Sequence, residues 1–194
     1  MSERELIHQG APTLAGLKTG SLFSCACDSW PLLLQEVRSW NRRLNHKGMM
    51  LLPLRKNGDR ALLYLFRPQA LAKDLAMPEL AAFLRQAGYS DLRPSACLIE
   101  LRSRLQTAGT FPHEIGLFLS YPIEDVKGFI THRGQNYKCS GCWKVYGDTN
   151  AAKRRFRQFQ MCTDAYLRRY DRGCPIEALV VGEKSKTQER MHLS

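Results

Sequence analysis

Apolar residues recur at helical spacing in the stretch that follows Asp28-Ser29-Trp30-Pro31. Polar residues with a proline in the first turn are a common helix start, so we predict a helix that runs to about His46 and ends at Gly48. The next two apolar runs, residues 49–55 and 60–67, are short and are separated by Asn57-Gly58. Because Asn-Gly between apolar runs favours a tight turn, this pattern predicts a β-hairpin.

Prolines begin the next three apolar stretches, and proline is favoured in the first turn of a helix. We predict helices over residues 68–76 and 78–87 and a third that starts at Arg93-Pro94. Residues 6–23 are rich in turn-forming residues and predict one helical turn after Pro12.

The second half of the chain predicts alternating strands and helices. We expect a buried strand at residues 113–119, a helix from Tyr121 to near Gly134, a short strand at 142–146, a long helix at 151–170 and a last strand at 176–181. Helices that cover a sheet are the usual packing for this order. The predicted fold class is therefore α/β (α+β-like), a small mixed sheet with an N-terminal β-hairpin covered by about six helices.

Chain length and composition favour one globular domain. The chain has 194 residues, of which 44% are hydrophobic, and domains commonly hold about 100–200 residues. We predict a single α/β domain over residues 1–182, and a flexible C-terminal tail over the polar residues 183–194.

The N-terminus and the cysteines indicate a compartment. Acidic residues occupy the first positions, no signal-peptide pattern follows, and the longest apolar stretch is far shorter than a membrane span. We therefore expect a cytoplasmic protein without a membrane partner, whose seven cysteines are mostly reduced. Proteins with a net charge as positive as +11 often bind nucleic acid, anionic membrane surfaces or acidic ligands.

His113 and Glu114 are the first candidates for chemistry. Neighbouring residues on a strand point to opposite faces, so the two side chains are not expected to form a direct acid–base pair. His113 is a candidate metal or haem ligand, or a general base near neutral pH. The catalytic candidates are His113, Glu114 and Tyr121. The alternative is a buried histidine bonded to backbone, with Glu114 paired to an arginine.

Cys139-Ser-Gly-Cys142 has the spacing of half a zinc or iron–sulfur site. A closed site needs about four ligands, and Cys139, Cys142, Cys162 and His113 are the predicted metal set, with iron, zinc or haem as the cofactor. The alternative is a pair of reduced thiols that pack as small apolar residues.

The C-terminal half is strongly basic. Between Lys127 and Arg172 the sequence holds eleven Lys and Arg residues but three acidic residues. On the predicted helix, Arg154, Arg157 and Arg168 fall away from the aromatic face and are candidates for contacts with nucleic acid. The alternative is a solvated helix face, since no recognised nucleic-acid-binding motif accompanies it.

Two other segments carry weaker signals. Residues 10–19 do not match a phosphate-binding P-loop, although Lys18 and Thr19 are candidates for lining a pocket. Glu124 and Asp125 lie in the first turn of a predicted helix, where acids favour the helix dipole.

Residues 111–130 (Phe-Pro-His-Glu-Ile-Gly-Leu-Phe-Leu-Ser-Tyr-Pro-Ile-Glu-Asp-Val-Lys-Gly-Phe-Ile) and the later Cys-Trp-Lys-Val-Tyr resemble a family of uncharacterised bacterial proteins, domain-of-unknown-function family 3793. Residues 11–18, 136–139 and 159–163 resemble it too, so the resemblance covers nearly the whole chain. The family often has cysteine before Ala-Pro-Thr-Leu, where this chain has Gly10. The resemblance implies no established activity, but it implies an iron or redox setting linked to flavodoxin.

We therefore expect a small cytoplasmic binding or accessory protein linked to iron or redox physiology, with a metal, haem or flavin-type ligand and a redox partner protein. Its pocket is predicted between residues 111–121 and 139–146. One alternative is a nucleic-acid-binding protein that uses the basic helix. The other is an enzyme with His113 as acid–base.

Overall fold

The computed structural model describes residues 1–107 and 111–182. Its main sheet has three antiparallel strands, β1 (Gly20–Ala26), β2 (Met50–Asn57) and β3 (Arg60–Phe66), in the order β1-β3-β2. The hairpin predicted from Asn57-Gly58 is confirmed, and Gly58 adopts the positive φ of +59° that the turn requires.

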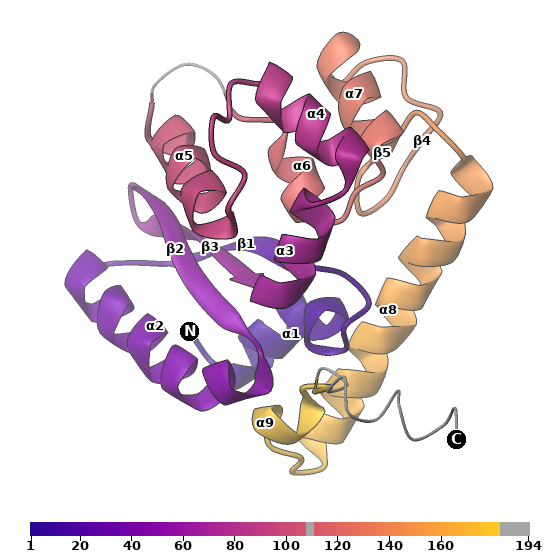
Figure 1. Ribbon diagram of the computed structural model, residues 1–194. Helices are drawn as coiled ribbons and strands as arrows, with labels where there is room; N and C mark the ends of the chain where they lie inside the picture. The colour runs from indigo at the N-terminus through magenta and orange to yellow at the C-terminus, as the bar shows by residue number, and fades with distance from the viewer. Residues whose placement is uncertain (108–110, 183–194) are drawn as a thin grey trace, which may run out of the picture.

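The central strand β3 divides the interior into two cores, because successive side chains of a strand point to opposite faces. Ala61, Leu63 and Leu65 face a core that includes helices α1 (Glu3–Leu14) and α2 (Trp30–Leu44). Figure 1 shows these two helices on the same side of the sheet. The helix predicted after Pro31 is thereby confirmed.

Tyr64 and Phe66 face the second core, which the next three helices cover. These are α3 (Pro68–Leu75), α4 (Pro78–Gln86) and α5 (Pro94–Gln106), and each has proline in its first turn as predicted. The Tyr64 hydroxyl donates to the carbonyl of Phe118 at 2.6 Å, which links the sheet to the segment beyond α5.

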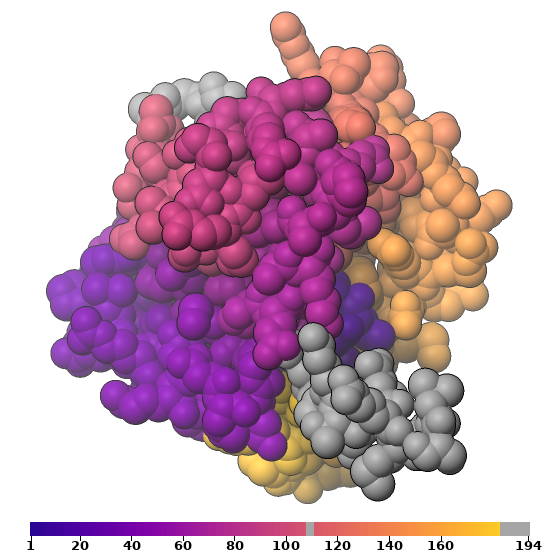
Figure 2. Space-filling view, in the orientation of Figure 1, coloured from indigo at the N-terminus to yellow at the C-terminus, as the bar shows by residue number. Residues whose placement is uncertain are grey.

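Part of the remaining chain builds a smaller third core. Helix α7 (Ile123–Thr131) is followed by a hairpin of two short strands, β4 (Cys139–Ser140) and β5 (Lys144–Val145), and by the long helix α8 (Thr149–Asp171). Trp143, Val145 and Phe159 form its buried centre. In Figure 2 this orange segment lies directly beside the magenta helices α3 and α4.

The N-terminal prediction was wrong. Residues 6–23, expected to be turns, form most of α1 and the start of β1. Ser2 and Glu5 make a capping box that fixes the start of α1, and Pro12 is accommodated near its end. Serines and small residues fill much of β1, so its hydrophobic alternation is weak, and pairing with β3 along all seven residues makes it a strand.

Two predicted strands are helical. Residues 113–119 contain the one-turn helix α6 (Ile115–Phe118), and residues 176–181 contain α9 (Ile176–Leu179). A short apolar run is consistent with a buried strand or a buried helical turn, and no neighbouring strand edge pairs with either segment in the described residues. Leu117 and Phe118 are buried in the second core instead.

The α/β fold class is confirmed, with two corrections of detail. The sheets are antiparallel rather than mixed, and the described residues hold nine α-helices rather than about six. The predicted tail at 183–194 lies outside the described residues. Within residues 1–107 and 111–182, no helix is both long and apolar enough to cross a membrane.

Candidate functional site

A pocket of about 280 Å³ opens between the α6–α7 segment and the β4–β5 hairpin. These are the two segments between which a pocket was predicted, although α6 replaces the expected strand. Seven lining residues come from the first segment and three from the hairpin: His113, Ile115, Gly116, Tyr121, Asp125, Val126, Phe129, Ser140, Trp143 and Lys144. We refer to this set as the aromatic pocket.

Aromatic side chains form two pairs in its walls. The Tyr121 ring stacks on Trp143 with centroids 4.8 Å apart and an interplanar angle of 27°. The His113 ring lies 4.8 Å from that of Phe129. Trp143 is in turn held by the edge of Phe156 from α8, with centroids 4.5 Å apart. The walls of the pocket are thus fixed by packing against a long helix.

Asp125 anchors the hairpin against α7. Its carboxylate is 3% exposed and accepts three hydrogen bonds of 2.7 Å, from the Trp143 indole N–H and from the backbone N–H groups of Tyr146 and Gly147. The sequence indicated only an acid in the first turn of a helix. Its partners lie about twenty residues away, so no local pattern could have identified this role.

Lys144 brings a positive charge to the pocket. Its ammonium donates to the Gly134 carbonyl at 2.8 Å and lies 4.8 Å from the Tyr137 ring centroid and 5.8 Å from that of Phe129. An ammonium group has three donors, so it can also donate to an anionic or carbonyl group of a ligand. The electrostatics of the pocket therefore favour a ligand that carries an acceptor.

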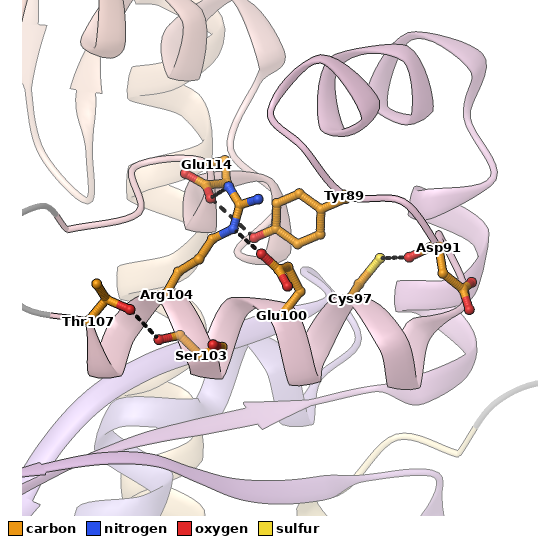
Figure 3. A network of polar contacts seen from close by, with 8 residues as sticks. All are labelled: Tyr89, Asp91, Cys97, Glu100, Ser103, Arg104, Thr107 and Glu114. Carbon is orange, nitrogen blue, oxygen red and sulfur yellow. Dashed lines mark hydrogen bonds and ion pairs between the residues drawn. The ribbon is translucent and has the colours of Figure 1, made fainter.

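His113 and Glu114 point to different places. His113 is exposed and lines the pocket, whereas Glu114 is buried. Glu114 accepts from Arg104 Nη1 at 3.0 Å and from the Tyr89 hydroxyl at 3.2 Å (Figure 3). Burial, with the Glu114 charge as a second cause, raises the pKa of Tyr89. Glu114 thus pairs with an arginine, and His113 has no direct acid–base contact with it.

The predicted metal set is not brought together. Among the described residues, all four of Cys139, Cys142, Cys162 and His113 included, no three His, Cys, Asp or Glu side chains are placed to hold a metal ion. All seven cysteines, which lie in the described ranges, have free thiols. Cys139 packs against the third core, Cys162 packs against the first core, and His113 lines the aromatic pocket, so the ligands predicted from spacing lie in different parts of the fold.

Lys18 and Thr19, from the loop between α1 and β1, lie outside the aromatic pocket but adjoin it. The Thr19 N–H donates to the Ser120 hydroxyl at 2.8 Å, and Ser120 has a left-handed φ of +59°. The Tyr121 hydroxyl donates to the Cys142 carbonyl at 3.2 Å. Three segments therefore meet around Tyr121: the loop that holds Lys18 and Thr19, the chain just before α7, and the turn of the β4–β5 hairpin.

Helix α8 presents its cations to solvent. Arg154, Arg157 and Arg168 are exposed, as predicted from helical periodicity, and Phe159 and Tyr166 are buried on the opposite side. Within the described ranges, none of these three arginines forms an ion pair. This face carries charge that the fold does not neutralise.

Comparison with known proteins gives one match. The family model described as Protein of unknown function (DUF3793) matches residues 6–180. No curated protein and no solved structure matches the chain.

Proposed function

The chain belongs to the family of proteins of unknown function DUF3793, and from this premise we propose that it is a small-molecule binding protein whose aromatic pocket takes a planar fused-ring ligand of the flavin class. The observation that carries the proposal is the two aromatic pairs, Tyr121–Trp143 and His113–Phe129, in the walls of one pocket. Flat rings gain most from such walls, because offset-stacked and edge contacts add about 0.5–1.5 kcal/mol per pair beyond burial.

Size and charge narrow the ligand class. Pockets for small molecules commonly hold about 300–1,000 Å³, so a pocket of about 280 Å³ favours one fused ring system over a macrocycle such as haem. Asp125 already accepts three hydrogen bonds, whereas Lys144 retains donors. A ring that carries a phosphate or carbonyl acceptor therefore fits better than a cationic ligand.

Titration with flavin mononucleotide tests the proposal. We expect saturable quenching of flavin fluorescence, because the ring stacks on Tyr121 or Trp143. His113→Ala removes an exposed pocket ring at little cost to the fold and is expected to weaken binding roughly threefold to tenfold, the equivalent of one lost aromatic contact. Lys144→Met is expected to weaken flavin mononucleotide more than riboflavin, which lacks the phosphate.

Lys153→Met, which removes an exposed lysine of α8, is the matched control and should bind both flavins as the natural chain does. Absence of saturable quenching by either flavin, or equal weakening by Lys144→Met and Lys153→Met, would contradict a flavin-type pocket.

A second candidate function is binding of nucleic acid through α8. One solvent-facing stripe holds Lys153, Arg154, Arg157, Arg168 and Arg172, all exposed. At a rise of about 1.5 Å per residue the stripe is roughly 28 Å long, which suits a run of backbone phosphates. Asp164 and Asp171 lie near the same stripe, and Asp171 is paired with Arg4.

Duplex DNA of random sequence tests this second function. We expect affinity that falls steeply with salt, and replacement of Arg154 and Arg157 by glutamate should reduce the slope of log affinity against log salt by about 0.9 per lost phosphate contact. Replacement of Arg38 and Arg42, two exposed arginines of α2, by glutamate is the control for net charge. Equal loss of affinity in both double variants would exclude α8 as the binding face.

A further inference from the structure

Tyr137 is an exposed aromatic residue beside the aromatic pocket. It lies in the connection between α7 and β4, and 43% of its surface is accessible to solvent. Within residues 1–107 and 111–182, its ring stacks on no other ring and its hydroxyl has no hydrogen-bond partner. The ring contacts the Lys144 ammonium, which lies 4.8 Å from its centroid. Tyr137 therefore offers ring surface to a flat group of a ligand.

The backbone around Tyr137 is held on both sides. Before it, the carbonyl of Gln135 accepts a hydrogen bond from the Tyr146 hydroxyl at 2.9 Å. After it, the N–H of Lys138 donates to the Val145 carbonyl of β5 at 2.8 Å. Because these bonds fix the chain before any ligand arrives, a group that stacks on Tyr137 has less protein segment to order, and ordering a segment is one of the costs of binding.

Lys144 connects Tyr137 to the aromatic pocket. Its ammonium lies 4.8 Å from the Tyr137 ring centroid and 5.8 Å from that of Phe129, which lines the pocket. Both rings therefore adjoin the same cation. A ligand whose ring system enters the pocket can pass Lys144 and reach Tyr137 with its remaining part.

The chain around this surface is basic. Residues 126–147 contain four lysines and arginines and neither aspartate nor glutamate. Three of the four, Arg133, Lys138 and Lys144, form no ion pair within the described ranges. The carboxylate in the pocket wall, Asp125, already accepts three hydrogen bonds. The part of a ligand that lies between the pocket and Tyr137 is therefore favoured when it carries negative charge.

We propose that the ligand of the aromatic pocket is a flavin dinucleotide, whose adenine base stacks on Tyr137 and whose pyrophosphate lies at Lys144. The proposal rests on the proposed function, because the flavin ring must occupy the pocket. A pocket of about 280 Å³ has room for that ring, so the rest of the ligand lies on the surface outside it. Every base has a flat face that stacks on an aromatic side chain, and the Lys144 ammonium keeps donors for the phosphates.

Calorimetric titration of the full chain with two flavins tests the proposal. We expect flavin adenine dinucleotide to bind about fivefold to tenfold more tightly than flavin mononucleotide, because it adds one stack of a base on tyrosine. If flavin mononucleotide binds and the dinucleotide binds no more tightly, the dinucleotide proposal is overturned while the flavin-type pocket stands. If neither flavin binds, the flavin-type pocket is contradicted and the dinucleotide proposal with it.

A matched pair of variants tests whether the Tyr137 ring is the cause. The measured quantity is the ratio of the two dissociation constants, mononucleotide over dinucleotide, in which any effect on the shared flavin ring cancels. Tyr137→Leu removes the aromatic face and should bring the ratio to about one, whereas Tyr137→Phe keeps the ring and should leave the ratio within about twofold of its natural value. Tyr137 is exposed, so both replacements are compatible with folding.

A ratio that stays at fivefold or more in Tyr137→Leu would show that the adenine base binds elsewhere and would overturn the proposal. An equal fall of the ratio in Tyr137→Leu and Tyr137→Phe would show that the hydroxyl rather than the ring holds the dinucleotide, which also contradicts a base stacked on Tyr137.

Discussion

Replacement of Asp125 with alanine is expected to lower the free energy of unfolding by about 3–5 kcal/mol. The substitution leaves three donors, the Trp143 indole N–H and the backbone N–H groups of Tyr146 and Gly147, without their buried acceptor. Each unsatisfied buried group costs about 1–3 kcal/mol, and water that enters the space offsets part of the sum. Because Trp143 and the hairpin lose their anchor, flavin binding should be lost as well.

Urea denaturation followed by circular dichroism measures this effect. Glu124→Ala is the matched control, since Glu124 is the neighbouring acid of the same helical turn but is exposed, and exposed sites usually change stability by less than about 0.5 kcal/mol. A loss below about 1 kcal/mol in Asp125→Ala would show that Asp125 does not hold the hairpin on α7.

Arg67→Met is expected to destabilise the protein by a similar amount, about 3–5 kcal/mol. Arg67 is 4% exposed and donates to the carbonyls of Thr13 and Leu14 at 2.7 Å and of Val181 at 2.8 Å. The last carbonyls of a helix have no partner within the helix, so at the end of α1 this buried guanidinium supplies it. Hydrogen bonds to charged groups contribute about 1.5–3 kcal/mol each.

Arg60→Met is the matched control for Arg67→Met. Arg60 lies at the other end of β3 and also donates to a backbone carbonyl, that of Ser24 at 2.9 Å, but its side chain is exposed. We expect Arg60→Met to cost less than about 1 kcal/mol in the same denaturation experiment. Similar losses in the two variants would mean that burial of Arg67 is not what makes it important.

Local signals accounted for the parts of the fold that the sequence predicted well. Proline in the first turn identified α3, α4 and α5, and Asn57-Gly58 identified the β2–β3 hairpin. These signals depend on a few neighbouring residues, so they predict local structure without knowledge of the tertiary contacts. By contrast, α6 and α9 are short apolar segments whose conformation depends on which neighbours they pack against, so the sequence pattern could not separate strand from helix.

The site depends even more on contacts between distant residues. Tyr121 and Trp143 are twenty-two positions apart, and Lys18 reaches the same region from the N-terminal loop. The sequence motifs were enough to predict which two segments line the pocket. The stacking of Tyr121 on Trp143 and the hydrogen bonds that Asp125 accepts from the hairpin follow from how α7 packs against that hairpin. For the same reason the metal set proposed from cysteine spacing did not converge.

The resonances of the indole N–H groups test the flavin-type pocket most directly. The chain has three tryptophans, Trp30, Trp40 and Trp143, and only Trp143 lines the aromatic pocket. In a ¹⁵N–¹H titration with riboflavin, we expect the Trp143 indole signal to shift saturably while those of Trp30 and Trp40 stay fixed. A titration in which the Trp143 signal does not move, or moves no more than those of Trp30 and Trp40, would contradict binding in the aromatic pocket.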